Sequence, residues 1–222
     1  MELSALPEKT QDYLKTVWEI TRDTGQPATL RSVTDQMGER ASTASEAMKR
    51  LAARGLVHHE RYAGITLTQQ GEQLAVQIVR RHRLLEMFLC EVLDFSWDEV
   101  HEEAEILEHA ITDRLIERID AHLGFPSRDP HGHPIPTADG DVEEVAEEDL
   151  TGARVGQSLI IDRISDRDPE LLRYLAAHGI TPGVLVQVQP APYSGVCVLQ
   201  GPGEPLTLSE SSLPLINVRR LP

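Results

Sequence analysis

The sequence predicts a mainly α-helical protein with small β parts, in which helices come first and strands come last. Two observations carry this prediction. Apolar residues recur at helical spacing through most of residues 7–123, whereas after about Gly152 the apolar runs are short and bounded by turn residues. Between these regions, "PSRDPHGHPIPTADG" is rich in proline and turn residues, which excludes a helix there. We expect three domains, at residues 1–70, 71–145 and 146–222, with 146–152 as a linker.

The charge of the chain is unevenly distributed. The net charge is −15, yet residues 1–84 contain 12 Lys and Arg against 10 Asp and Glu, and the remainder contains 9 against 26. The first third can therefore approach a polyanion that the rest would repel. Cys90 and Cys197 lie far apart, and the chain has no signal peptide and no apolar run of about 20 residues. We therefore expect a cytoplasmic protein with neither disulfides nor a membrane segment.

The N-terminal domain is predicted to contain three helices and a hairpin. "PEKTQDYLKTVWEI" places Leu14 and Trp18 on one helical face, and "TLRSVTDQMG" is a short helix that ends at Gly38. In the next helix, "ASTASEAMKRLAARG", Thr43 and Glu46 have the spacing of a capping box. "LVHHERYAGITLT" then predicts two short strands around a turn. This order is that of a winged helix-turn-helix.

Such a fold binds DNA by laying the second helix of the pair in the major groove. Short polar side chains near the start of that helix suit base edges, and the basic residues supply charge for phosphates. The candidate DNA-binding residues are Arg31, Arg40, Ser42, Thr43, Ser45, Lys49, Arg50 and Arg61, the last at the tip of the wing. The weak positive charge favours a dimer that pools the contacts of two half-sites. A small α+β domain whose serines only cap helices is the alternative.

The middle domain is predicted to be helical, with three helices that have recognisable starts. Thr68 can cap the long helix "LAVQIVRRHRLLEMFLCEVL", Ser96 and Glu99 form a capping box, and Thr112 precedes "DRLIERIDAHLG". The helix after Ser96 contains "HEEAEILEHA", whose apolar residues are spaced like an inner stripe. These are Ala104, Ile106, Leu107 and Ala110.

Histidines and carboxylates lie beside that stripe. Residues three and four apart share a helical face, and these spacings align two such groups on consecutive helices, with a further carboxylate on the first helix. The residues are His101, Glu105, Glu108 and His109 in one group, His82 and Glu86 in the other, and Asp12. Unpaired carboxylates near a core are costly, and a divalent ion would offset their repulsion. The pattern alone leaves two interpretations open, a metal site and a solvated acidic face.

Enzyme motifs are poorly supported. A zinc protease of the His-Glu-x-x-His type is excluded because position 105 is Glu, and the paired Glu-x-x-His of di-iron bundles is missing. The sequence has neither a nucleophile elbow nor a phosphate loop. We therefore expect no enzymatic activity and no small-molecule substrate, with a di-metal hydrolase or oxidase as a remote alternative.

Several segments, in this order, resemble the diphtheria toxin repressor family of metal-dependent transcriptional repressors, in its long three-domain form. They are "QDYLKTVWEI", "GLVHHERYAGITLTQQG", "RRHRLLEMFLCEVL", "VHEEAEILEHAITDRLIERI" and "DPHGHPIP", and they extend over nearly the whole chain. The resemblance implies a winged helix-turn-helix, a helical metal-binding and dimerisation domain, and a C-terminal SH3-like β-barrel domain. It also implies a homodimer that binds palindromic double-stranded operator DNA near metal-uptake genes once a divalent metal is bound.

The resemblance also implies two metal sites. The primary site would consist of Asp12, Glu105, Glu108 and His109, and the ancillary site of His82, Glu86 and His101. The SH3-like domain would add Asp162 or Asp166, in an alignment that needs a one-residue gap.

Two differences from the family pattern indicate the metal. Iron-type members have a thioether and a cysteine where this sequence has Asp12 and Glu105, and oxygen ligands suit Mn²⁺. The resemblance therefore favours the manganese-responsive branch, with Fe²⁺ as the alternative. Short manganese regulators have a glutamate where this chain has Lys15, which favours separate primary and ancillary sites over a dinuclear one. For His131 and His133, in a turn-forming context, we expect structural roles.

Overall fold

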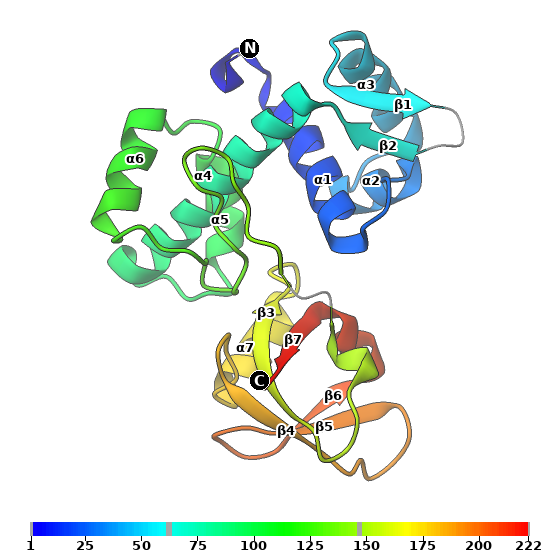
Figure 1. Cartoon of the computed structure of the whole chain (residues 1–222), viewed down its shortest axis with the longest axis vertical. Helices are drawn as coiled ribbons and strands as arrows, with labels where there is room; N and C mark the ends of the chain where they lie inside the picture. Colours follow the sequence, from blue (N-terminus) through cyan, green and yellow to red (C-terminus); the bar gives the residue numbers. More distant parts are fainter. Residues whose placement is uncertain (1, 61–63, 146–147, 222) are drawn as a thin grey trace. The chain divides into compact units, whose positions relative to one another are not determined.

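The computed structural model describes residues 2–60, 64–145 and 148–221. Its elements are η1 (Leu3–Ala5), α1 (Glu8–Thr24), α2 (Leu30–Met37), α3 (Ala41–Ala53), β1 (Val57–Glu60), β2 (Gly64–Leu67), α4 (Gln69–Leu93), α5 (Val100–Leu107), α6 (Asp113–His122), η2 (Leu150–Gly152), β3 (Ser158–Ile164), α7 (Pro169–Ala177), β4 (Leu185–Gln189), β5 (Val196–Gln200), β6 (Leu206–Ser209), η3 (Glu210–Leu215) and β7 (Ile216–Arg220) (Figure 1). The chain forms two compact units. The first contains Met1–His82, Leu107–Ile111 and Pro136–Asp141, and the second contains Arg83–Ile106, Thr112–Ile135 and Val142–Pro222.

The first unit contains the predicted winged helix-turn-helix. Helices α2 and α3 are joined by a tight turn at Gly38, whose φ of +64° is a left-handed conformation that suits glycine. Strands β1 and β2 then pair antiparallel. Leu14, Met48 and Ile65, from α1, α3 and β2, are completely or almost completely buried, so one core joins these elements. The predicted order of elements is confirmed.

The predicted capping box of Thr43 and Glu46 is wrong. The N-cap of helix α3 is Arg40, three residues before Thr43, and it makes no side-chain cap. Because Thr43 is already inside the first turn, its amide bonds the Arg40 carbonyl at 3.0 Å. Glu46 instead accepts a hydrogen bond from Lys49, at 2.7 Å on the exposed side of the helix.

Helix α4 starts as predicted and then runs from the first unit into the second. The Gly71 amide donates to Thr68 Oγ1 at 3.1 Å, and the same hydroxyl donates to the Gly55 carbonyl at 2.8 Å. Thr68 therefore caps α4 and ties its start to the end of α3. Although α4 has 25 residues, no helix in the described part of the chain combines the length and apolar character that a membrane crossing needs.

The segment around α5 differs from its prediction. Ser96 and Glu99 bond as expected, with Ser96 Oγ donating to Glu99 Oε2 at 2.6 Å, and Thr112 caps α6. The helix, however, ends at Leu107, and residues 108–110 form a turn. The expected inner stripe holds for Ala104, which is buried, but is wrong for Ile106, whose surface is 70 % exposed.

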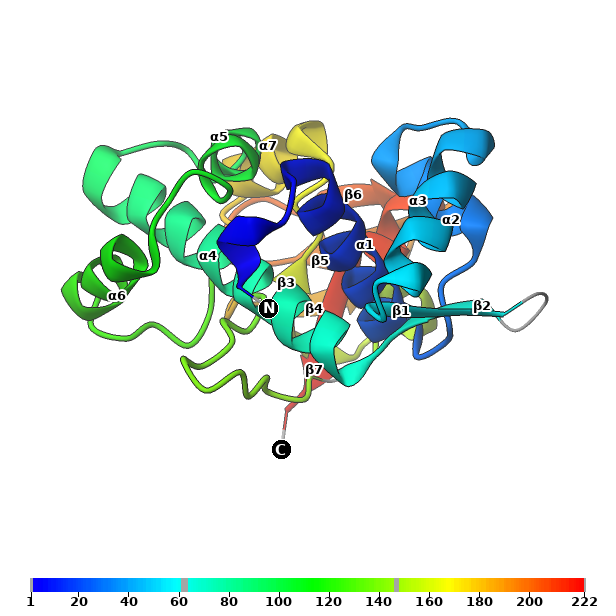
Figure 2. The same ribbon diagram turned by 90° about the horizontal axis from the view of Figure 1, so that it is seen from above.

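The second unit contains a five-stranded antiparallel sheet in the order β6-β5-β4-β3-β7. Helix α7 follows β3 in the chain (Figures 1 and 2). Its Leu172 and Leu175 are completely buried in the same core as Ile161 and Leu199 of the strands. The predicted small β domain is confirmed. Strand β6 has no clear local signal in the sequence, because "LTLS" is short and follows the turn-rich segment "GPGEP".

The "DPHGHP" segment is held against the end of β3. Asp129 Oδ1 accepts hydrogen bonds from the His131 and His133 amides, each at 2.9 Å, and the His131 carbonyl accepts from the Ile164 amide at 2.9 Å. Gly132 has a φ of +92°, and a Cβ there would lie 2.3 Å from the Asp162 carbonyl oxygen. Only glycine permits this close approach. We call residues 128–134 the Gly132 loop.

Candidate functional site

Asp12, Glu108 and His109 come together in the first unit. Asp12 lies on α1, and the other two lie in the turn after α5. His109 Nε2 is 2.9 Å from Asp12 Oδ1 and 3.8 Å from Glu108 Oε1, and its Nδ1 is 3.2 Å from Gln11 Oε1. One donor atom from each of the three residues lies within 4.8 Å of the others. The Gln11 contact orients the ring so that Nε2 faces both carboxylates.

Two atoms of this group have unmet bonding capacity. Asp12 Oδ1 and Glu108 Oε1 are buried and accept no hydrogen bond of good geometry from the described residues, although His109 Nε2 lies 2.9 and 3.8 Å from them as an ion-pair partner. One imidazole shared by two buried carboxylates satisfies them incompletely, so a cation between them would be stabilising. Two carboxylates and an imidazole are also a donor set that divalent transition metals accept. The residues therefore fit a divalent metal ion.

The protonation of His109 supports the same conclusion. The Asp12 carboxylate raises the pKa of His109 above its ordinary value, against the lowering effect of burial, and Glu108 contributes in the same direction. Without metal, the two carboxylates therefore favour the protonated form of the imidazole. Binding of a divalent ion would release that proton.

Lys15 occupies the other side of Glu108. Its ammonium is 2.8 Å from Glu108 Oε2 and 2.9 Å from His82 Nδ1, and His82 Nδ1 is 2.6 Å from the same oxygen. The Lys15 and Glu108 side chains are only 6 % and 0 % exposed, so this is a buried ion pair. An internal cation thus already serves one oxygen of Glu108, which leaves Oε1 as the atom that faces Asp12 and His109.

Helix α1 connects the group of Asp12, Glu108 and His109 to α3 of the helix-turn-helix. Next to Asp12, the Tyr13 hydroxyl donates to Glu39 Oε2, and Lys9 Nζ is 2.9 Å from Glu39 Oε1. Glu39 immediately precedes Arg40, the N-cap of α3. The Glu39 hydrogen bond and the burial of Tyr13 both raise the pKa of that phenol well above its usual value, with burial the larger cause, so the hydroxyl remains a donor. These contacts link α1 directly to the start of α3.

Most of the predicted DNA-binding residues are exposed. Arg31 lies on α2 and pairs with Asp35 at 3.5 Å, Ser45 is half-buried, and Arg61 lies outside the described residues. The others are exposed at the N-cap or along α3; they are Arg40, Ser42, Thr43, Lys49 and Arg50. The short polar side chains of Ser42 and Thr43 are therefore exposed near the start of α3. The basic side chains of Arg40, Lys49 and Arg50 are exposed on the same helix or at its N-cap.

A second group lies in the second unit. His101 Nδ1 on α5 is 3.5 Å from Glu86 Oε1 on α4 and 3.4 Å from Asp166 Oδ2, which follows β3. Burial alone would lower the pKa of His101, but the carboxylates of Asp166 and Glu86 raise it to about 10. Although burial would raise the pKa of Asp166, His101 holds it well below its usual range. Glu86 and His101 were predicted as ancillary ligands, and of the two aspartates considered, the structure places Asp166 beside them.

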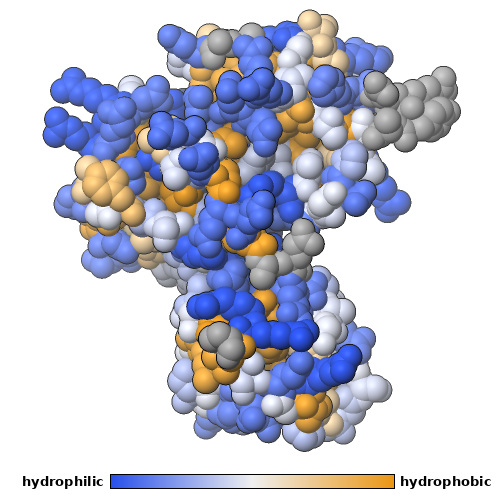
Figure 3. All heavy atoms as spheres, viewed as in Figure 1, coloured by the Kyte–Doolittle hydropathy of each residue, from blue (hydrophilic) through white to orange (hydrophobic). Residues whose placement is uncertain are grey.

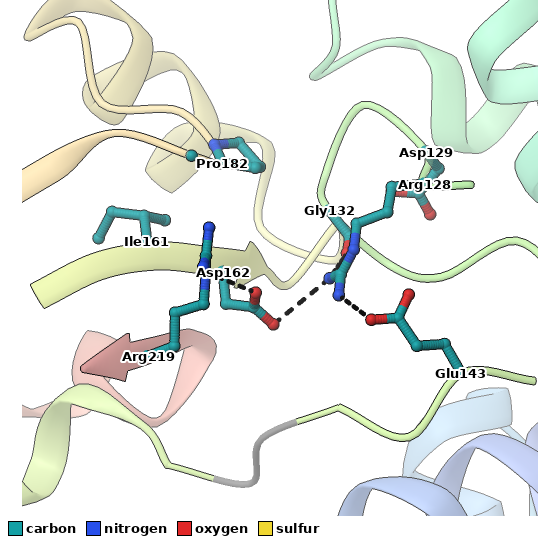
Figure 4. Close-up of a pocket in the computed structure, with 9 residues that line it drawn as sticks. Arg128, Asp129, Gly132, Glu143, Ile161, Asp162, Pro182 and Arg219 are labelled. Carbon is teal, nitrogen blue, oxygen red and sulfur yellow. Dashed lines mark hydrogen bonds and ion pairs between the residues drawn. The ribbon is translucent and has the colours of Figure 1, made fainter. Parts of the chain in front are cut away.

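Asp162 has different partners. It lines a pocket of about 520 Å³ between the Gly132 loop and the sheet. Figure 4 shows Arg128 and Arg219 reaching Asp162 from two sides, at 3.4 and 3.6 Å, while Arg128 also pairs with Glu143 at 2.9 Å. The Asp162 charge is therefore already balanced by guanidinium groups.

Two further predicted residues are placed as follows. Glu105 on α5 belongs to the second unit, where its Oε1 is 3.9 Å from His101 Nε2. His82 was predicted with Glu86 and His101, and its Nδ1 contacts Glu108 in the first unit. Sequence analysis did not foresee this pairing, because the contact joins residues 26 positions apart and no local spacing reveals it.

Comparisons with known proteins match all three parts of the chain. Residues 5–65 match the N-terminal DNA-binding domain of iron-dependent repressors, residues 68–137 their metal-binding and dimerisation domain, and residues 149–220 the FeoA domain. The chain is 26 % identical to the iron-dependent repressor IdeR of Mycobacterium tuberculosis (strain ATCC 25618 / H37Rv), over 99 % of this chain and all of that protein. It is 29 % identical to the diphtheria toxin repressor of Corynebacterium efficiens, over 82 % of this chain and 84 % of that protein.

Solved structures agree. A manganese-dependent transcriptional repressor in complex with manganese is 42 % identical, with a TM-score of 0.89, over 96 % of this chain and all of that one. The manganese regulator SloR is 30 % identical, with a TM-score of 0.79, over 96 % of this chain and 98 % of that one.

The winged helix-turn-helix, the buried His-carboxylate groups and these matches define a metal-dependent, DNA-binding transcriptional repressor. The resemblance drawn from the sequence is confirmed at the level of the family. The chain belongs to the diphtheria toxin repressor family.

Proposed function

We propose that the protein is a Mn²⁺-activated homodimeric repressor that binds palindromic operator DNA and controls metal-uptake genes. The observation that carries the proposal is the group of Asp12, Glu108 and His109, in which two buried carboxylate oxygens share one imidazole as their ion-pair partner. Its two carboxylates make it oxygen-rich, and oxygen ligands suit Mn²⁺. The similar repressor described as a complex with manganese supports the same choice. Fe²⁺ is the second candidate, because relatives of similar length are named iron-dependent.

The proposed ligands of the activating ion are Asp12, Glu108 and His109. Glu105, three residues before Glu108 in the chain, is the proposed fourth ligand and adds another oxygen donor. A bound divalent ion would supply the positive charge that balances these carboxylates. Lys15 holds the remaining oxygen of Glu108 and so orients its carboxylate toward the site.

The ligands act on DNA binding through α1. Asp12 fixes α1 to the turn that carries Glu108 and His109, and the neighbouring Tyr13 holds Glu39 at the start of α3. Metal binding that favours one position of α1 would therefore also favour one position of α3, whose exposed face carries the proposed DNA contacts. Because the coupling is thermodynamic, operator DNA must tighten metal binding by the same factor.

Exposed apolar side chains support the homodimer. They lie within residues 68–137, the part that matches the dimerisation domain, and include Val92, Leu93, Phe95, Ile106, Leu115 and Phe125. Hydrophilic residues cover most of the face that Figure 3 shows, with apolar residues between them. Because removing apolar side chains from water is favourable, a second copy that covers them would be stabilising. Sedimentation equilibrium should show a dimer that Leu115→Asp weakens.

Operator binding measured with and without metal tests the proposal. DNA ligands are first selected from a random duplex library in the presence of Mn²⁺, and their sequences should be palindromic. Fluorescence anisotropy is then measured in EDTA, in Mn²⁺ and in anaerobic Fe²⁺. We expect Mn²⁺ to tighten binding by about 5–150-fold, the usual range of allosteric coupling.

Variants identify the site. Asp12→Ala and His109→Ala should abolish the effect of metal, whereas His122→Ala, which removes an exposed histidine outside the group, should retain it. Equal DNA affinity in EDTA and in Mn²⁺ would refute the proposal. Changing Asp12 to Met and Glu105 to Cys should shift the preference toward Fe²⁺, because softer ligands replace oxygen.

A further inference from the structure

Two side chains of α1 bind both carboxylate oxygens of Glu39, the residue before the N-cap of α3. The Tyr13 hydroxyl donates to Oε2, and Lys9 Nζ lies 2.9 Å from Oε1. The Tyr13 hydrogen bond, together with Lys9, lowers the pKa of Glu39 against the opposing effect of burial. Glu39 is therefore negatively charged at neutral pH, and its charge lies beside the start of the helix that carries the proposed DNA contacts.

Lys9 is shared between Glu39 and a second carboxylate, that of Asp12. The Lys9 ammonium is 4.0 Å from Asp12 Oδ2, and the two residues are three positions apart on one face of α1. The other oxygen, Asp12 Oδ1, lies 2.9 Å from His109 in the proposed activating site. The two oxygens of Asp12 therefore have different partners, and one of these partners also serves Glu39.

The charges of these groups make Lys9 responsive to metal. A divalent ion bound by Asp12 would balance that carboxylate and repel the nearby ammonium, because both are cations. The Lys9 side chain is 55 % exposed and has a flexible stem, so its ammonium can change position, whereas the Glu39 side chain is only 18 % exposed. Metal binding would therefore leave Glu39 as the carboxylate that Lys9 serves.

The pairing of Glu39 matters for DNA binding because phosphates repel an unbalanced carboxylate. Glu39 immediately precedes Arg40, and the exposed Ser42 and Thr43 lie in the first turn of α3. When Lys9 is displaced toward Asp12, the Glu39 charge opposes the approach of the DNA backbone. When Lys9 pairs with Glu39 alone, that charge is balanced, and the start of α3 repels phosphates less.

Further contacts hold α1 against the same segment. Thr16 Oγ1 donates to Met37 Sδ at 3.0 Å, and Gln36 Nε2 donates to Glu19 Oε2 at 2.6 Å. Tyr13, Thr16 and Glu19 follow one another at intervals of three positions, so one side of α1 contacts the end of α2 and the turn before α3. The backbone around the pair is therefore held in place, and the exposed ammonium is the part that moves.

We propose that Lys9 couples the activating site to DNA binding. In the metal-free protein it is shared by Asp12 and Glu39, and once Asp12 binds a divalent ion it pairs with Glu39 alone. Lys9 is thus a positioning residue for charge at the start of α3, with Tyr13 as the fixed hydrogen-bond donor on the other oxygen of Glu39. The inference rests on the proposed function, because Asp12 is a ligand of the proposed activating ion.

The coupling factor, which is the ratio of DNA affinities in Mn²⁺ and in EDTA, tests the proposal. It is measured by anisotropy on the duplex selected in the presence of Mn²⁺. Lys9→Met keeps the apolar stem without the charge, and Glu39→Gln keeps an acceptor for Tyr13 without the charge. Each should lower the coupling factor by about 2–30-fold, the range that single changes along a coupling path produce. The double variant should lose no more than either single variant, because both remove the same interaction.

The Mn²⁺ affinity of the DNA-free protein gives a second and more specific readout. It is measured with a competing fluorescent chelator in a His101→Ala background, which disables the second group. Lys9→Met should bind Mn²⁺ more tightly than its parent, because a cation beside Asp12 is gone. Glu39→Gln should bind Mn²⁺ more weakly, because Lys9 then pairs with Asp12 alone. Loss of packing would not move the two affinities in opposite directions.

Two controls accompany these variants. Lys9→Arg keeps the charge and should retain most of the coupling. Asp35→Asn removes an exposed carboxylate of α2 that pairs with Arg31, and it should change DNA affinity equally in EDTA and in Mn²⁺. Wild-type DNA affinity that Mn²⁺ does not change would refute the proposed function. In a coupled wild-type protein, full coupling in either Lys9→Met or Glu39→Gln, or Mn²⁺ affinities that fail to move in opposite directions, would overturn the role of Lys9 alone.

Discussion

Substitution of Lys15 by methionine removes a buried cation from beside Glu108. The Lys15 ammonium is 2.8 Å from an oxygen of a carboxylate that is 0 % exposed, and it also contacts His82. Methionine retains the apolar stem but leaves the carboxylate without its counter-ion. Removal of one member of a buried ion pair costs about 3–5 kcal/mol, because the remaining charge is uncompensated. We expect metal-free Lys15→Met to lose about 3 kcal/mol of unfolding free energy in the first unit.

Urea denaturation in EDTA measures this loss. In a Trp97→Phe background, Trp18 of α1 is the remaining tryptophan, and its fluorescence reports the first unit. The control is Lys49→Met, which breaks a 2.7 Å pair with Glu46 whose side chains are 64 % and 61 % exposed. Since exposed pairs contribute little, this control should match wild type.

Metal should partly reverse the effect. Without the ammonium, the Glu108 carboxylate loses its buried counter-charge, so Mn²⁺ bound beside it should stabilise Lys15→Met more than wild type. Binding at 100 times the dissociation constant contributes about 2.7 kcal/mol. A Lys15→Met protein as stable as wild type in EDTA would show that the pair is solvated, and the argument for an internal cation would fail.

Three further predictions concern the elements around the sites. Gly132→Ala should destabilise the second unit by ~2 kcal/mol or more, because its Cβ would lie 2.3 Å from the Asp162 carbonyl oxygen. Gly124→Ala, whose Cβ would meet no atom within 4 Å, should lose less unfolding free energy. Trp97 fluorescence in urea measures both variants. Burial, with Glu86, raises the pKa of the half-buried Cys90 to about 12, so a thiol reagent at pH 9 should modify it far more slowly in the native protein than after unfolding. The contribution of the raised Cys90 pKa to the free energy of unfolding is fully present below the thiol's unfolded pKa of about 8.5, and it is lost as the pH rises toward 12. Cys90→Ala should remove this pH dependence. Equally fast modification of Cys90 in native and unfolded protein at pH 9 would contradict the raised pKa. Thr68→Ala should lose about 1 kcal/mol in urea through its bonds to Gly71 and Gly55, and Thr68→Ser should retain most of it.

The sequence predicted the fold well wherever local chemistry decides it. Gly38, Thr68 and Thr112 mark helix ends through their own caps or backbone conformations, and the structure uses all three as predicted. Thr43 shows the limit, because capping-box spacing inside a helix is indistinguishable from that at its start. The prediction that Ile106 is buried was wrong for a different reason. Its spacing suits an inner stripe, but α5 ends one residue later, at Leu107, and Ile106 is exposed.

The sites could be predicted only in part. The spacing of Glu108 and His109 and the position of Asp12 led to a group that the structure brings together. The partner of Glu108 could not be found in this way, since Lys15 is 93 positions away and reads as an ordinary helical lysine. His131 was assigned a structural role because its turn is rich in proline and glycine. Its position beside the buried Glu86 depends on tertiary packing, which no local pattern shows.

The two faces of α1 explain how one ion can affect a distant surface. Gln11, Asp12 and Lys15 contact the residues after α5, while Leu14 belongs to the core shared with α3 and β2. A helix buried on both sides moves as a rigid body, because close-packed side chains transmit displacement rather than absorb it. In the metal-free protein, the ion pairs His109–Asp12 and Lys15–Glu108 connect α1 to the residues after α5. Ion pairs tolerate a range of distances and angles between their partners. A divalent ion that binds Asp12 and His109 at fixed distances would restrict the positions that α1 can adopt. The contact between Tyr13 and Glu39 would then restrain the start of α3 as well.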